Sequence, residues 1–191
     1  MKTVLISFIT IVIIQLFIPA KMIYDRELPK IYGEEFKFET RPIDPYDPFR
    51  GKYVTLNFAA NEIGVNRTEK WKGGDIVYVK FEKAENGLAI ISSIHKKEPR
   101  DTDFYLKTKV SHVQRGKKCS VFINYPFTRY YMEETKAEKA EMLTMSLDRE
   151  KQQIISATVK LYRGEATITA LMVNDISMEK AVGNDKIKHY H

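Results

Sequence analysis

The sequence predicts an α+β fold in which about eight strands, mostly antiparallel, form a curled sheet, a sandwich or a partly open barrel. One long helix packs on the strands, and a transmembrane helix precedes them. Three observations support this prediction: an uncharged apolar run at the N-terminus, repeated alternation of apolar and polar residues, and one stretch of helical periodicity near residue 140. The chain has 191 residues, which is enough for one domain with a sizeable core.

The N-terminal segment predicts a membrane anchor. Val4–Ala20 carries no charge, and its polar side chains are Ser7, Thr10 and Gln15. A helix of this length can cross a hydrocarbon core of about 30 Å. A cleaved secretory signal is a second interpretation, although Ile18 is larger than the residue such a cleavage site prefers. A buried helix of a soluble protein is the third. We expect residues 1–22 to be the anchor and residues 23–33 to be a juxtamembrane helical extension that ends in a linker.

Charges around the apolar run bear on its orientation. One lysine precedes it, and Lys21, Arg26 and Lys30 follow it. Counting these charges slightly favours a cytoplasmic location for the rest of the chain. Long domains are translocated largely regardless of flanking charge, however. We therefore expect a single-pass protein of the cell membrane with its domain on the extracytoplasmic, periplasmic side.

Alternating apolar residues predict strands throughout the domain, which we place at residues 34–178. The predicted strands are residues 35–39, 53–58, 76–82, 88–94, 104–110, 119–125, 155–161 and 166–172. Asn86-Gly87 and Arg163-Gly164 stand between two pairs of them, where a hairpin needs left-handed backbone positions. Residues 61–72, which include Trp71, read as a polar connection.

The periodicity becomes helical at Glu133. The apolar residues that recur at helical spacing are Ala137, Ala140, Leu143 and Leu147. Acidic residues begin this segment and Arg149 ends it, as the helix dipole prefers. We expect this helix to pack on one side of the sheet. The polar residues 179–191 are expected to form a flexible tail.

Several kinds of chemistry lack their motifs in this chain. The net charge of +6 comes from basic residues dispersed among 25 acidic ones, which indicates a solvated surface and no nucleic-acid partner. Cys119 is the one cysteine, so no intramolecular disulfide can form, and we interpret it as a buried structural thiol. His95 and His112 have no further ligands at metal-binding spacing. We expect no metal and no cofactor, and we assign no catalytic residue.

Two segments stand out as a candidate binding surface. In the first, prolines stiffen a loop that carries paired charges, which either fix turns by pairing with one another or form a site for a cation or a polar ligand. The second is rich in aromatic residues and suits core packing with protein docking. The candidate residues are Arg41, Asp44, Asp47, Arg50, Tyr53, Arg129, Tyr130, Tyr131 and Glu133.

The same two segments carry a family resemblance. Residues 41–58, RPIDPYDPFRGKYVTLNF, resemble the signature of the GDYxxLxY family of bacterial membrane-anchored proteins. Residues 129–134, RYYMEE, are similar to that family's second motif, an aromatic pair followed by Val-Pro-Glu-Gly. Lys52 stands where the name-giving aspartate would be, and Phe58 replaces the final tyrosine. The resemblance extends over the whole chain and implies a single N-terminal span with an envelope domain, but no established activity.

These observations lead to two functional hypotheses. The first is a non-enzymatic, membrane-anchored envelope protein whose domain binds a membrane or envelope protein partner. The alternative is an envelope enzyme or small-ligand binder that uses the Arg41–Arg50 loop. Lys52 favours the first hypothesis, because any chemistry that depended on the family's aspartate would be lost.

Overall fold

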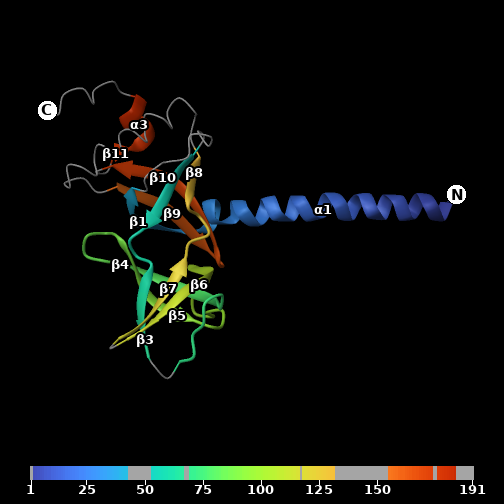
Figure 1. The fold of residues 1–191 in the computed structure, drawn as a ribbon. Helices are drawn as coiled ribbons and strands as arrows, with labels where there is room; N and C mark the ends of the chain where they lie inside the picture. The colour runs from blue at the N-terminus through green and yellow to red at the C-terminus, as the bar shows by residue number, and fades with distance from the viewer. Residues whose placement is uncertain are drawn as a thin grey trace.

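The computed structural model describes residues 2–42, 53–66, 69–116, 118–131, 155–173 and 176–183 (Figure 1). Within these residues, eleven strands form two antiparallel sheets, and two helices flank them. The helices are α1 (Lys2–Tyr32) and α3 (Met178–Gly183). The strands are β1 (Glu34–Pro42), β2 (Tyr53–Phe58), β3 (Glu62–Val65), β4 (Ile76–Lys83), β5 (Ala89–His95), β6 (Tyr105–Arg115), β7 (Cys119–Asn124), β8 (Arg129–Tyr131), β9 (Ile155–Tyr162), β10 (Glu165–Val173) and β11 (Ile176–Ser177).

The first sheet has six strands in the order β11-β10-β9-β1-β2-β8. β1 pairs with β9 from Glu34 opposite Leu161 to Thr40 opposite Ile155, so the first strand lies in the middle of the sheet. The hairpin predicted at Arg163-Gly164 is confirmed, with β9 and β10 as its strands. Arg163 has a φ of 46° and Gly164 a φ of 87°. These left-handed positions are the ones that a two-residue hairpin turn requires.

The second sheet has five strands in the order β3-β7-β6-β4-β5. Its edge strands β3 and β5 also contact each other, so this sheet curls toward closure. The hairpin predicted at Asn86-Gly87 is confirmed as β4–β5. Of the two turn residues, Gly87 is left-handed, with a φ of 75°, whereas Asn86 is not. In Figure 1 the two sheets occupy the upper and lower halves of the domain.

Three strands were not predicted: β3, β8 and the two-residue β11. β3 lies inside the segment expected to be a polar connection, and β8 is only three residues long. In β3, Ile63 and Val65 pack against the core while Glu62 and Gly64 alternate with them. Four residues are the shortest run in which alternation indicates a strand, so β3 gives only a weak signal in the sequence. Pairing with β7 forms this strand.

One aromatic cluster joins the two sheets. The ring of Phe38 in β1 is fully buried and lies 5.0 Å from the ring of Phe81 in β4 (centroid to centroid). It also contacts Phe58 at 5.7 Å and Phe127 at 6.0 Å. Since Phe38 and Phe81 come from different sheets, the sheets share a single hydrophobic core.

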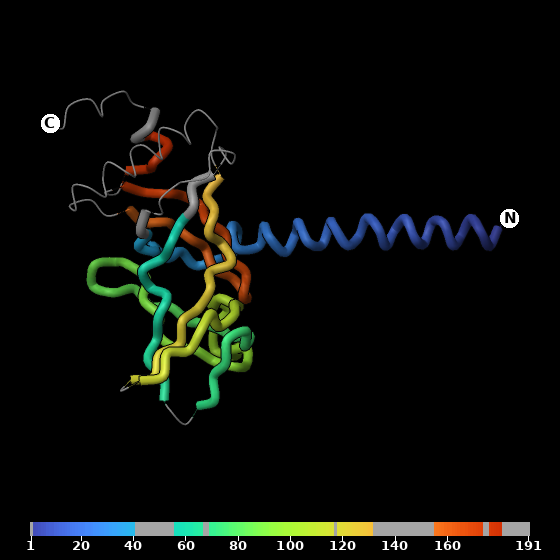
Figure 2. Tube along the Cα trace, viewed as in Figure 1, coloured from blue at the N-terminus to red at the C-terminus, as the bar shows by residue number. Residues whose placement is uncertain are grey.

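The helix α1 runs directly into the domain. Residues 23–33 were expected to be a helical extension that ends in a linker; α1 continues to Tyr32, and only Gly33 separates it from β1. The Gly33 N–H donates to the Pro29 carbonyl at 2.9 Å. Lys160 Nζ in β9 donates to the Lys30 carbonyl at 2.9 Å. Figures 1 and 2 show the rest of α1 extending clear of the strands, with the N-terminus at its far end.

Two further expectations concern the C-terminal part of the chain. The helix predicted from Glu133 to Arg149 lies outside the described residues. The flexible tail was expected to begin at Glu179, but α3 occupies Met178–Gly183. Residues 184–191 lie outside the residues that the structure describes. Met178 is fully buried within the hydrophobic core. Its burial explains why ordered structure continues into the segment expected to be a tail.

Candidate functional site

The two motif segments meet at one edge of the six-stranded sheet. β2 and β8 pair antiparallel, with Tyr53 opposite Tyr131 and Val54 opposite Tyr130. The pairing places candidate residues that are more than 70 positions apart in the chain side by side. Figure 1 shows this strand pair at the end of the domain that also holds α3.

The described part of the candidate surface can be placed residue by residue. The backbones of Arg41 and Tyr53 lie in β1 and β2, and Arg129, Tyr130 and Tyr131 make up β8. The other four candidates lie outside the described residues: Asp44, Asp47, Arg50 and Glu133. The hypothesis of a charged site in the loop therefore stays a prediction.

Alternate residues of β8 have different surroundings. Tyr131 is 66% exposed and Arg129 is exposed, whereas the intervening Tyr130 is half-buried. This difference follows from the pleat, which directs successive side chains to opposite faces. β8 thus presents a tyrosine and an arginine to solvent at the edge of the sheet.

Tyr130 links the two ends of the six-stranded sheet. Its hydroxyl donates to Glu179 Oε1 in α3 at 3.2 Å. β8 is one edge of the sheet, and α3 directly follows β11, which is the other edge. Burial, with a smaller contribution from the Glu179 carboxylate, raises the pKa of Tyr130 to about 12. The six-stranded sheet therefore curls so that its two edge strands, β8 and β11, approach each other. The hydrogen bond from Tyr130 to Glu179 connects β8 with the helix that follows β11.

The departure at Phe58 has a structural explanation. Phe58 is 3% exposed and lies 4.7 Å from the ring of Tyr125 and 5.3 Å from that of Phe127. A ring in this position contributes by packing, and phenylalanine brings no hydroxyl that would need a partner. This end of the motif therefore belongs to the core, so part of the signature is structural.

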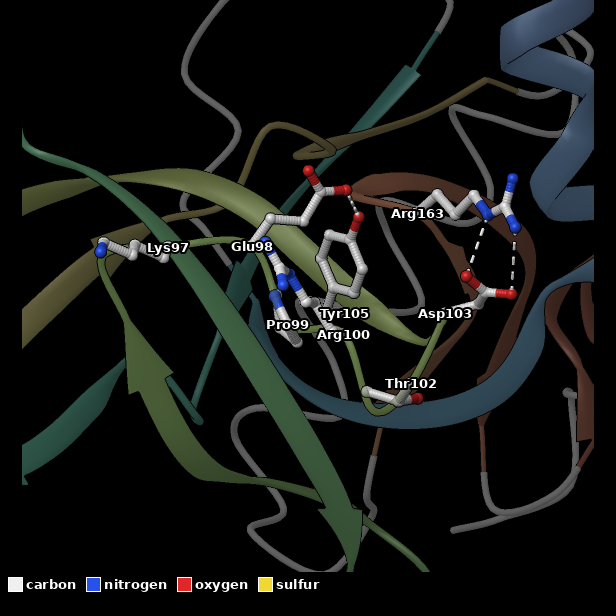
Figure 3. A pocket seen from close by; sticks show the side chains of 8 residues that line it. All are labelled: Lys97, Glu98, Pro99, Arg100, Thr102, Asp103, Tyr105 and Arg163. Carbon is white, nitrogen blue, oxygen red and sulfur yellow. Dashed lines mark hydrogen bonds and ion pairs between the residues drawn. The ribbon is translucent and has the colours of Figure 1, made fainter.

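A cavity of about 770 Å³ lies between the β5–β6 loop and the β9–β10 turn (Figure 3). In it, Arg163 Nε donates to Asp103 Oδ1 at 2.9 Å, and the hydroxyl of Tyr105 donates to Glu98. Burial and the Glu98 carboxylate raise the pKa of Tyr105. The carboxylates of Asp103 and Glu98 both accept hydrogen bonds from neighbouring side chains. The geometry therefore supports a structural role for them more than a role as a catalytic base. Arg163 and Asp103 are 60 positions apart in the chain, and no sequence pattern would have identified them as partners.

A second cavity, of about 610 Å³, includes Trp71 and Cys119 in its lining. Cys119 is half-buried, so the expectation of a buried thiol is only partly met. Trp71 is 2% exposed, and its indole N–H has no acceptor among the described residues. Lys96 Nζ lies 4.8 Å from the centre of the indole ring, a cation–π contact that covers one face of it.

Within the described segments, no group of three or more histidine, cysteine, aspartate or glutamate residues is arranged to hold a metal ion. His95 shares a hydrogen bond of 2.9 Å with Ser93. The ring of His112 stacks on Phe122, with centroids 4.2 Å apart. Both histidine side chains thus have partners within the five-stranded sheet.

Comparison with known proteins identifies the family. The model of the family described as "GDYXXLXY protein" matches residues 15–171. No curated protein and no solved structure shows a significant match. The matched region runs from within α1 to β10 and contains both motif segments that pair as β2 and β8. The chain is therefore a member of the GDYXXLXY family.

Proposed function

We propose that this protein is a single-pass, membrane-anchored envelope protein whose extracytoplasmic β domain is a non-enzymatic binding module for a membrane or envelope protein partner. The observation that supports membrane anchoring is the exposed apolar surface of α1. None of the apolar 18-residue window of α1 is buried by the domain. Apolar surface left in water is unfavourable by about 25 cal/mol per Å². A lipid bilayer removes that surface from water, and cleavage of a signal sequence is the competing outcome.

The junction between α1 and the sheet supports a partner in or near the membrane. From Ala20, where the apolar run ends, to Gly33 the helix rises about 20 Å at 1.5 Å per residue. No linker intervenes, and Tyr32 contacts Tyr162 in β9 with ring centres 5.8 Å apart. An inserted α1 therefore holds the domain close to the bilayer surface, within reach of other membrane proteins.

The candidate surface supports protein binding more than catalysis. β8 is an edge strand that exposes Tyr131 and Arg129. Tyrosine and arginine are enriched at protein interfaces and at the residues that dominate binding energy. We propose that this edge, together with the predicted loop residues around Arg41–Arg50, contacts the partner.

Anchoring and orientation can be tested in cells. We expect the full-length chain, with its N-terminus intact, to stay with membranes after alkaline extraction, and protease added to spheroplasts to digest the domain. A soluble chain that begins at Lys21 would establish a cleaved signal and overturn the anchor. Protection of the domain in intact spheroplasts would overturn the proposed orientation.

Partner binding can be tested by site-specific photo-crosslinking. A photoreactive residue at Tyr131, which is 66% exposed, is expected to capture a membrane or envelope protein. The matched control is the same residue at Ile76, which is 52% exposed in β4 of the other sheet. Capture at Tyr131 and not at Ile76 supports the proposed surface. Capture at neither position, or equal capture at both, would contradict it.

A further inference from the structure

Two polar side chains in the apolar part of α1, Ser7 and Gln15, make no hydrogen bond to a described residue, and Gln15 carries the larger polar group. Gln15 is exposed and makes no hydrogen bond to any described residue. It stands five residues before Ala20, so an inserted helix places it about 8 Å inside the apolar boundary at 1.5 Å per residue. A glutamine side chain is shorter than this depth and cannot bring its amide to the headgroups. This step rests on the membrane anchoring proposed above.

Thr10 shows how a polar group in the same run avoids this problem. Its hydroxyl donates to the Ile6 carbonyl at 2.9 Å, one turn earlier in the helix. The amide of Gln15 has two N–H donors and a carbonyl acceptor. In hydrocarbon no water can satisfy these groups, and an unpaired amide is costly there. A second helix in the membrane can supply the partner that the described residues do not give Gln15.

We propose that Gln15 joins two copies of α1 in a parallel dimer within the membrane. Two copies insert in the same orientation, which brings both Gln15 residues to the same depth. A primary amide is both donor and acceptor, so it is complementary to itself across a two-fold axis. A helix of a different protein would instead need its own polar group at this level. The chemistry of Gln15 thus favours a second copy as the occupant.

The residues around Gln15 form a suitable helix seam. Positions that alternate three and four residues from it fall on one side of a supercoiled helix, as in a coiled coil. On this side lie the exposed apolar residues Phe8, Ile11, Ile18 and Met22. A single polar residue in such a seam fixes the register and the number of helices. Gln15 would have this role in α1.

The β domain leaves the seam accessible. The side of α1 that packs on the domain includes Asp25, Leu28 and Pro29, the last of which is buried. Asp25 and Pro29 continue the same alternation of three and four residues, so the seam is free as far as Met22 and meets the domain beyond it. The domain buries none of the apolar window itself. The helices would therefore pair along residues 8–22, before α1 reaches the domain.

Sedimentation equilibrium of the full-length chain in density-matched micelles tests the proposal. We expect wild type to dimerise and Gln15→Leu to raise the dissociation constant roughly 3- to 30-fold, the range that membrane hydrogen bonds support. Gln15→Asn keeps the amide and should retain part of the affinity. Thr10→Val is the matched control and should match wild type, because the Thr10 hydroxyl is already satisfied inside the helix.

The outcomes separate this inference from the proposed function. Equal dimerisation of Gln15→Leu and wild type would overturn the role of Gln15. A wild-type chain that resists alkaline extraction but stays monomeric at every protein-to-detergent ratio would overturn the dimer and leave the anchor standing. A chain that is not retained in membranes would overturn the anchor itself. The buried Trp71 reports whether each variant is folded.

Discussion

Replacing Gly33 with alanine tests whether α1 and the sheet form one rigid unit. A Cβ at this position would lie 2.3 Å from the Pro29 carbonyl oxygen and 3.1 Å from the Leu161 carbonyl oxygen. Both obstacles are backbone atoms, so no side-chain rotation relieves the clash. The end of α1 must shift away from β9, which also disturbs the hydrogen bond from the Gly33 N–H to Pro29.

The magnitude follows from these two effects. Forcing extra volume into a packed site costs about 1–3 kcal/mol, and a lost backbone hydrogen bond costs about 1 kcal/mol. We therefore expect Gly33→Ala to lower the free energy of unfolding by about 2–4 kcal/mol. Trypsin should also cut more readily after Lys30, because the carbonyl of Lys30 is held by Lys160 only while the helix end is docked.

Denaturant unfolding in micelles measures this effect, with the emission of Trp71 as the signal. Trp71 is the single tryptophan and is 2% exposed, so its environment changes when the core opens. Gly64→Ala in β3 is the matched control, since a Cβ there meets no atom within 4 Å. The control should stay within about 0.5 kcal/mol of wild type. If Gly33→Ala also did so, with unchanged cleavage after Lys30, the rigid junction would be refuted.

The β domain supports three further predictions. Tyr130→Phe should cost about 0.5–1.5 kcal/mol by removing the hydrogen bond to Glu179, measured by the same unfolding assay. The raised pKa of Tyr130 means that the folded state holds this proton more tightly. Wild type should therefore lose stability as pH rises from about 10 to about 12, and Tyr130→Phe should lose less; parallel curves would contradict this reasoning. Gly164→Ala should destabilise by more than about 1 kcal/mol, because φ is 87° and the new Cβ would lie 2.9 Å from Lys107 Cβ. Asp103→Ala breaks only an exposed ion pair with Arg163 and should lower the free energy of unfolding by at most about 1 kcal/mol. A larger loss for Asp103→Ala than for Gly164→Ala would contradict this prediction.

Local signals account for the parts of the fold that could be predicted. The β4–β5 and β9–β10 hairpins were recognisable because alternation and turn residues specify them within about 20 positions. β3, β8 and β11 were missed because runs of four, three and two residues show too little periodicity. β3 and β8 form by pairing with distant strands. The sequence did not show where α1 ends, because contacts with β9 and β10 stabilise its last turns despite Pro29.

The candidate site, like the fold, was predicted from the sequence only in part. The sequence pointed to both motif segments and to the family, because their residue types are distinctive even when read alone. Only tertiary structure showed that the segments are neighbouring strands. It also showed that Phe58 is a core residue and that Tyr130 reaches Glu179 across the open side of the sheet.

The sequence by itself therefore determined the apolar helix, the strand-rich domain and the hairpins, since hydrophobic periodicity and turn chemistry act over a few neighbouring residues. Tertiary structure alone decided how the strands divide into two sheets, how α1 joins them without a linker, and which motif residues face solvent. These features depend on contacts between residues such as Tyr130 and Glu179, which are 49 positions apart. Such contacts form when the sheets curl around a shared core, and no local pattern encodes them.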